Sequence, residues 1–218
     1  MTFVYRRFKG IIYNKSLLFK IDIMKKSSIL IAALFLLCSA QAQKTHLGVK
    51  GGVNVSNLHF NDNVTTHSKV GVNFGILAHI HASKTWAIQP ELVYSLEGGK
   101  PGDNSDVTYN LNFLNVPVLL QYMFENGFRL EGGPQIGFLL SAKTKTNDVT
   151  VTNHGFESTA ISLPLGAGYL TSSGWGIDAR YVFGLSNLNS DRNGSTIQSN
   201  VFQLGLFYQF SDTKFHHH

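Results

Sequence analysis

The chain has 218 residues, of which 18 are Lys or Arg and 13 are Asp or Glu, so its formal charge is +5. Seven of the basic residues but only one acidic residue precede Gln43, which leaves 11 basic and 12 acidic residues and a formal charge of −1 in the remainder. A domain with this charge lacks the basic surface that nucleic-acid binding requires, so we exclude nucleic acids as partners.

Residues 24–42 have the layout of a secretory signal peptide. Lys25 and Lys26 precede an apolar run that ends at Cys38, and Ala40-Gln41-Ala42 supplies the small residues of a cleavage site. The run is shorter than the ~20 apolar residues of a membrane-spanning helix. We therefore expect the chain to be exported.

This assignment divides the chain into three parts. Residues 1–23 are expected to be an upstream extension or a miscalled start, residues 24–42 the signal peptide, and residues 43–218 the mature domain. The chain's one cysteine, Cys38, leaves with the signal, so disulfides have no part in the mature protein.

After Gln43 the sequence alternates between apolar and polar residues, a pattern typical of β-strands. In 175–187, Ile177 and Tyr181 lie on one face and Asp178 and Arg180 on the other. The charged residues of the strands all fall on one face. The alternation predicts eight strands, at 45–57, 68–81, 85–97, 108–124, 127–142, 158–171, 175–187 and 197–210.

Two arrangements fit these two-faced strands. In a soluble sandwich or lipocalin-like barrel the apolar face packs inward, whereas in a transmembrane barrel it meets lipid and the polar face lines the lumen. The aromatic residues favour the second, because they gather at both ends of an aliphatic band, as membrane interfaces select. One girdle comprises Trp86, Tyr122, Phe124, Phe128, Tyr169, Trp175, Tyr208 and Phe210, and Tyr94, Phe113, Phe138 and Phe202 lie nearer the other strand ends.

Connections between the predicted strands alternate in length. Short turns at 83–84, 125–127 and 172–174 contain Gly, Asn or Ser, and longer polar loops occupy 58–67, 98–107, 143–157 and 188–196. In outer-membrane barrels the turns are periplasmic and the loops extracellular. The sequence therefore predicts an all-β fold, an eight-stranded antiparallel up-and-down transmembrane β-barrel. We expect it to be a monomer in the outer membrane whose partners are the lipid bilayer and the barrel-assembly machinery.

Two irregularities interrupt this pattern. In 108–124 the apolar positions are odd up to Phe113 and even from Val116, which predicts a β-bulge near Leu114-Asn115. In addition, Pro90, Pro117, Pro134 and Pro164 lie inside predicted strands, where each removes a ladder donor, so we expect a local irregularity at each.

Strands in hydrocarbon cannot leave backbone groups unpaired, so the first and last strands must pair and close the barrel. Eight strands enclose an interior that side chains just fill. The charged residues of the polar face should then meet as a network centred on Arg180 with Glu131 and Glu91, because buried charges persist when they are paired. An ion path is the functional alternative to this structural network. Its members are Lys50, Glu91, Arg129, Glu131, Asp178 and Arg180.

Several segments together resemble a known family. They are Leu114–Pro117, Gly133–Gln135, Gly166–Tyr169, Arg180–Leu185 and Val201–Phe210, within a similarity that covers nearly all of 44–210. These segments are similar to the outer-membrane β-barrels known as porin-family or PorT-like proteins of Bacteroidota. The resemblance implies the eight-stranded fold, an outer-membrane location and no catalytic residues. The tail 211–218 departs from it, since such chains usually end near the last aromatic residue, here Phe210.

Sites for metals, cofactors and catalysis are weak in this sequence. His79 and His81 have a spacing that could hold a metal, but no third ligand is evident, and His216–His218 form a solvent tail or a tag remnant. We expect no metal, no cofactor and no catalytic residue, with a structural, adhesion or narrow-channel role. The alternatives are a barrel enzyme acting on lipid or peptide at the cell surface and a soluble lipocalin-like ligand-binding barrel. Candidate rim residues for an enzyme are Ser95, Asp103, Asp106, Ser141, His154, Ser186 and Asp191.

Overall fold

A computed structural model describes residues 45–60, 66–102, 107–146, 149–153, 155–191 and 195–210. Among these residues there is no helix with the length and hydrophobicity needed to cross a bilayer. The predicted extension 1–23, the predicted signal 24–42 and the tail 211–218 lie outside the described residues. In the described ranges the chain forms β1 (Thr45–Phe60), β2 (Thr66–His81), β3 (Trp86–Pro101), β4 (Val107–Met123), β5 (Phe128–Gly132), β6 (Gln135–Thr146), β7 (Val149–Thr152), β8 (Thr159–Leu170), β9 (Trp175–Gly184) and β10 (Ile197–Gln209).

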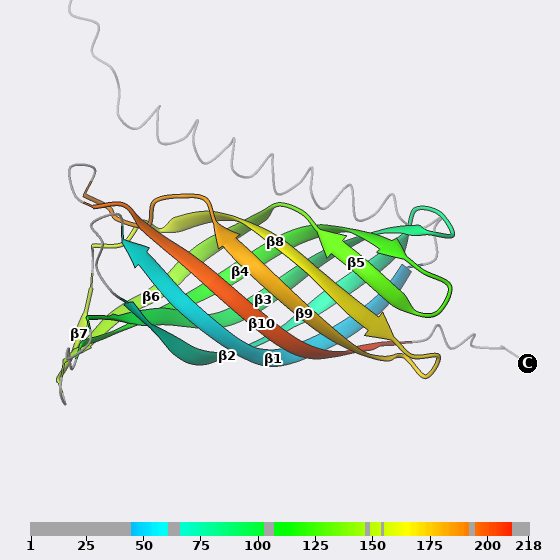
Figure 1. Ribbon diagram of the computed structural model, residues 1–218, viewed down its shortest axis with the longest axis horizontal. Helices are drawn as coiled ribbons and strands as arrows, with labels where there is room; N and C mark the ends of the chain where they lie inside the picture. Colours follow the sequence, from blue (N-terminus) through cyan, green and yellow to red (C-terminus); the bar gives the residue numbers. More distant parts are fainter. Residues whose placement is uncertain are drawn as a thin grey trace, which may run out of the picture. The chain divides into compact units, whose positions relative to one another are not determined.

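These strands make an antiparallel ring of eight, with β5 and β6 sharing one place in it (Figure 1). β1 pairs with both β2 and β10, from Gly48 opposite Gln209 to Phe60 opposite Ile197, so the first and last strands close the barrel. β7 lies outside the ring and pairs with the end of β6. The predicted fold class is therefore confirmed.

The orientation of the side chains is that of a transmembrane barrel. Leu92, Ile136 and Tyr181 are 40–50 % exposed on the outer face, whereas Glu91 and Arg180 are at most 4 % exposed inside. A soluble barrel needs the opposite arrangement, with charges in water and apolar side chains in the core. The lipocalin-like alternative is therefore wrong.

The turns and loops follow the predicted alternation. Several strands, β1 and β2 among them, are longer than predicted on the loop side, whereas β9 ends at Gly184, before the predicted end at 187. β1 and β2 run to Phe60 and from Thr66, because their ends keep pairing with β10 and β3. At the opposite end, Gly127 and Gly174 adopt φ values of 90° and 89° in the turns before β5 and β9. A residue with a Cβ rarely adopts this conformation, which explains glycine at both turns.

The predicted bulge in 108–124 is wrong. β4 keeps one phase, with every odd residue from Leu111 to Gln121 buried. The irregularity lies in the neighbouring β6, where the pairing shifts between Asn112 and Phe113 of β4 and Leu140 is the extra residue. Leu111 and Phe113 therefore face the lumen, and Phe113 is not part of an aromatic girdle.

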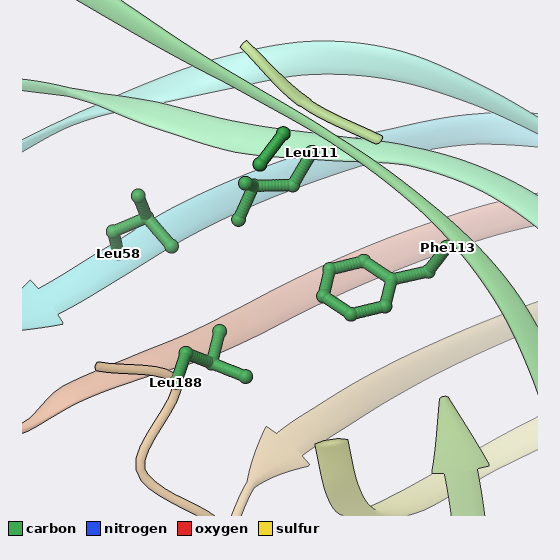
Figure 2. Close-up of a cluster of buried hydrophobic side chains, with 5 residues drawn as sticks. Leu58, Leu111, Phe113 and Leu188 are labelled. Atoms are coloured by element: carbon green, nitrogen blue, oxygen red, sulfur yellow. The ribbon is translucent and has the colours of Figure 1, made fainter. Parts of the chain in front are cut away.

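Leu111 and Phe113 belong to a buried apolar cluster near the loop end of the barrel, here called the loop-end cluster. Its members are Leu58, Leu111, Phe113, Ala142 and Leu188, each at most 5 % exposed. Figure 2 shows Leu58 of β1, Leu111 and Phe113 of β4, and Leu188 from the segment after β9 directed into one shared space. The lumen is thus lined by apolar side chains near the loop end. The sequence-based expectation that polar residues line the lumen throughout is wrong at this height.

The four in-strand prolines behave differently from one another. Gly133-Pro134 interrupts the strand between β5 and β6, yet the register against β4 is the same on both sides, with Leu120 opposite Gly132 and Pro117 opposite Gln135. Pro117 and Pro164 lie within unbroken strands, buried on the lumen side. Pro90 likewise lies within the unbroken β3, opposite Val118, and the register shows no shift there. The expectation of an irregularity at every proline is wrong for these three.

Candidate functional site

The lumen holds the six charged residues that the sequence singled out. They come from four strands, β1, β3, β5 and β9, and all are at most 7 % exposed. They comprise three cations and three anions, so their formal charges sum to zero. The members, here called the lumen network, are Lys50, Glu91, Arg129, Glu131, Asp178 and Arg180.

Arg180 lies at the centre of the lumen network. Its Nη1 and Nη2 donate to the two carboxylate oxygens of Glu91 at 2.7 and 2.8 Å, and its Nε donates to Glu131. Asp178 lies further off, with 3.6 Å between its Oδ1 and the Arg180 Nε. The paired contact with Glu91 is the parallel two-bond geometry that a guanidinium and a carboxylate favour.

Lys50 links two of the anions from another wall. Its Nζ lies 3.4 Å from Glu91 Oε2 and 3.3 Å from Asp178 Oδ2. Glutamine amides complete the carboxylate shells, since Gln89 Nε2 donates to Glu91 at 2.8 Å and Gln121 Nε2 to Glu131 at 2.7 Å. Charges taken out of water need such extra hydrogen bonds to offset the cost of desolvation.

Arg180 and Glu91 come from strands that are far apart around the ring. Counted through β4, β5 and β8, or through β2, β1 and β10, β9 is the fourth strand from β3. In a ring of eight, these strands lie on opposite walls. The Arg180–Glu91 ion pair therefore spans the lumen from wall to wall.

Glycines on the lumen face make room for these long side chains. Gly166 lies opposite Arg180 on the neighbouring strand, and a Cβ there would come within 2.7 Å of Arg180 Cγ. In the same way, a Cβ at Gly205 would come within 3.0 Å of Asp178 Oδ1. The Gly-rich polar face of the sequence is thus the surface against which the charged side chains pack.

Arg129 lies toward the short-turn end of the lumen. Its Nη1 donates to Gln121 Oε1 at 3.4 Å, and its guanidinium sits 5.5 Å from the ring centre of Phe207. Phe207 in turn covers Gly176, where a Cβ would come within 2.2 Å of the ring. Arg129 therefore extends the filled part of the lumen toward the turns.

A second polar layer lies between the lumen network and the loop-end cluster. Glu97 is buried and accepts hydrogen bonds from Ser95 at 2.9 Å, Asn115 at 3.1 Å and Ser199 at 3.1 Å. Asn54 donates to Ser95 Oγ at 2.8 Å and so continues the layer to β1. The sequence placed Glu97 on the polar face but did not single out this layer, although the parity of these residues within their strands marks them as inward.

Three histidines, His46, His79 and His81, gather at the short-turn end of β1 and β2. The rings of His79 and His81 are 4.7 Å apart, and His46 lies 5.6 Å from His81, so the structure adds a third histidine to the predicted pair. Among the described residues, however, no three His, Cys, Asp or Glu side chains have an arrangement suited to a metal ion. His216–His218 lie outside the described residues.

The predicted rim residues do not assemble into a catalytic group where the structure describes them. Ser95 is buried in the Glu97 layer, whereas the Ser186 hydroxyl accepts from the Ile161 amide at 2.8 Å. Ser141 lies in β6 and Asp191 follows β9. Asp103, Asp106 and His154 lie outside the described residues.

The predicted girdle residues form rows of touching rings on the outer face. Ring centres are 5.0 Å apart for Trp86 and Tyr122 and 4.9 Å for Tyr122 and Phe124, and Phe128 continues this row. A second row joins Trp175, Tyr208 and Phe210 at 5.0 and 5.4 Å. Tyr169 is paired with Phe128 across β8 and β5.

Comparison with known proteins points to one group. The family described as "Outer membrane protein beta-barrel domain" matches residues 40–190. The solved structure of Neisserial surface protein A has a TM-score of 0.54 at 10 % identity, over 77 % of this chain and 100 % of that chain. Ail, the attachment invasion locus protein of Yersinia pestis, gives 0.48 at 16 % identity, over 77 % and 99 %. OprG of Pseudomonas aeruginosa gives 0.43 at 13 %, over 77 % and 97 %. Comparison with the curated proteins gave no match.

Proposed function

Because this chain belongs to the family of outer membrane protein β-barrel domains, it is an integral barrel of the outer membrane, and we propose that it is a closed anchor rather than a channel. In this role the barrel holds its loop-bearing end at the cell surface, for a structural or adhesive task. The proposal assigns no catalytic residue. Specificity would then reside in the loops, the usual place for binding residues on a rigid scaffold.

The wall-to-wall Arg180–Glu91 pair is the observation that carries this proposal. Lys50, Glu131 and Asp178 fill the same region from β1, β5 and β9, so side chains from alternate strands meet across the lumen. An ion moving through would have to separate charges that are already paired and enclosed. Paired charges at the centre therefore favour a structural network over an ion path.

The loop-end cluster supports the same conclusion at a second level. Leu58, Leu111, Phe113 and Leu188 come from β1, β4 and the segment after β9, and all are at most 2 % exposed. Apolar constrictions exclude water and ions by dewetting. The lumen is thus filled by an ionic layer and by an apolar layer nearer the loops.

Conductance in planar bilayers tests the closed-anchor proposal. We expect the refolded wild-type barrel to give no resolved current steps, because both layers would block ions. Insertion is checked in the same sample by heat-modifiable gel mobility, and an open porin under identical conditions is the positive control. Regular unitary steps from the inserted wild-type barrel would contradict the proposal and favour a narrow channel.

We further propose the orientation of the barrel and the role of its girdle. The turns before β3, β5 and β9 face the periplasm, and the loops with the β6–β7 hairpin face outward, as is general for such barrels. The rings from Trp86 to Phe128 and from Trp175 to Phe210 then lie at the periplasmic membrane interface. The same proposal has three further parts. The barrel is assembled by the barrel-assembly machinery, it is a monomer, and it belongs to the PorT-like group of Bacteroidota.

Removal of residues 1–42 is also part of this proposal. The apolar run before Ala40-Gln41-Ala42 would direct export, and cleavage after Ala42 would leave an N-terminus at Gln43. N-terminal sequencing of the protein recovered from outer membranes should therefore begin at Gln43. An outer-membrane form that begins at Met1 or Met24 would contradict the assignment.

A further inference from the structure

The outer wall of the barrel carries an apolar groove close to its short-turn end. The groove has a volume of about 540 Å³ and extends over β1, β10, β9, β8 and β5. That volume lies in the ~300–1,000 Å³ range of small-molecule sites. Large apolar side chains cover most of this face, so a hollow of this size needs an explanation.

The groove exists because small residues adjoin one another across the strands. Ala167 of β8 and Ala179 of β9 are direct partners, and both point outward and line the groove. The next outward row toward the turns contains Tyr169 and Ile177, which are also partners and are 44 % and 57 % exposed. The two alanines thus form a floor beside a wall of large side chains.

The remaining walls extend this apolar lining. Leu204 of β10 is the partner of Ala179, and Leu206 is the partner of Ile177. Phe128 of β5, partner of Tyr169, completes the edge nearest the turns. Asp178 also lines the groove through its backbone, because its carboxylate points into the lumen toward Lys50. Of the described residues that line the groove, none places a charged side chain in it.

The surroundings of the groove identify its occupant. The face lies in hydrocarbon, because the chain spans the outer membrane. The groove begins at the Phe128–Tyr169 pair of the girdle, the level at which aromatic rings meet lipid headgroups. Beyond this pair, the β8–β9 turn exposes Thr171, Ser172 and Ser173. Thr171 Oγ1 already donates to the Trp175 carbonyl and lies 2.8 Å from Ser173 Oγ, whereas the Ser172 hydroxyl can donate to a headgroup. From the turn inward, the Ser172 hydroxyl, the aromatic pair at headgroup level and the apolar hollow follow one another along β8.

We propose that this groove binds one acyl chain of a phospholipid from the leaflet on the short-turn side. The headgroup lies beside Ser172 of the β8–β9 turn, and the acyl chain lies over Ala167 and Ala179 between the larger side chains. A flexible acyl chain can fill such an irregular hollow, whereas a second barrel would present its own rigid, convex wall. The proposal rests on membrane embedding and not on the closed lumen.

Native mass spectrometry of refolded barrels tests the groove. The full mature chain is reconstituted in vesicles of palmitoyl-oleoyl-phosphatidylethanolamine, extracted in a mild non-ionic detergent and sprayed. We expect a peak for the wild-type barrel with a single bound phospholipid. Ala179→Leu fills the floor, so the lipid-bound fraction should fall by roughly tenfold. Ala167→Leu, a second filling variant, should do the same.

The matched control is Ala78→Leu on β2. Ala78 also points outward but does not line the groove. It should leave the lipid-bound fraction unchanged, and heat-modifiable mobility verifies that each variant is folded. Loss of lipid in both filling variants but not in A78L supports the proposal. Equal retention in all variants, no retention by the wild type, or a dimer peak that only the filling variants lose would overturn it.

Discussion

Replacing Arg180 by alanine should destabilise the barrel by about 3–5 kcal/mol, the cost of removing one partner from a buried ion pair. The substitution leaves Glu91 and Glu131 without their central cation, and both carboxylates are at most 7 % exposed. Urea titration in phospholipid vesicles, followed by tryptophan fluorescence and heat-modifiable mobility, measures the free energy of unfolding.

A double-mutant cycle separates the ion pair from general damage. Arg180→Ala together with Glu91→Ala should lower the free energy of unfolding by less than the sum of the two single substitutions. In the double variant neither member of this ion pair remains as a buried charge without its partner. Lys84→Ala, in the exposed turn before β3, is the matched loss of a positive charge and should change stability little. A loss for Arg180→Ala within the ~0–1 kcal/mol of an exposed ion pair would refute the lumen network as a stabilising element.

Replacing Phe113 by alanine should cost about 3–5 kcal/mol, the range for deleting a large aromatic side chain from a packed core. Phe113 is 2 % exposed in the loop-end cluster, and its neighbours Leu58, Leu111 and Leu188 are held by different segments, so they cannot close the cavity easily. The same unfolding titration in vesicles gives the loss of stability.

Phe138→Ala is the matched control for Phe113→Ala. Phe138 lies in β6 with 44 % of its surface exposed on the outer face, where lipid can replace the lost ring. Because lipid tails are as apolar as the side chain, its removal should cost much less. If the two substitutions cost the same, Phe113 would not lie in a packed interior, and the lipid-facing position expected from the sequence would be favoured instead.

The sequence predicted those features that depend on a strict alternation along one strand. In β9 the large outward residues Trp175, Ile177, Tyr181 and Phe183 are exposed and the small outward Ala179 is half-buried, whereas Asp178 and Arg180 are buried. Successive side chains of any strand point to opposite faces, whatever the strand packs against. The assignment of residues to the two faces can therefore be made from the sequence alone. The absence of charge from one face then indicated which face meets lipid.

The errors arose where the prediction assumed that a lumen is polar throughout. Leu111 and Phe113 were assigned to the lipid face because they are apolar, and a bulge was placed at Leu114-Asn115 to allow this. A constant phase from Gln121 back to Leu111 is the simpler interpretation of the same residues, and it is the observed one. The true irregularity, at Leu140 of β6, left no mark in the sequence because it depends on the partner strand.

By itself, the sequence determined the fold class, the two faces of each strand and the identity of the charged residues inside, because local alternation and the need to pair every backbone group leave few other solutions. Only the tertiary structure decided which charges meet. Arg180 and Glu91 are 89 residues apart and join because the register around a closed ring places them on opposite walls at one height. The loop-end cluster and the outer groove depend on the same register, which aligns large residues from separate strands in one place and small ones in another.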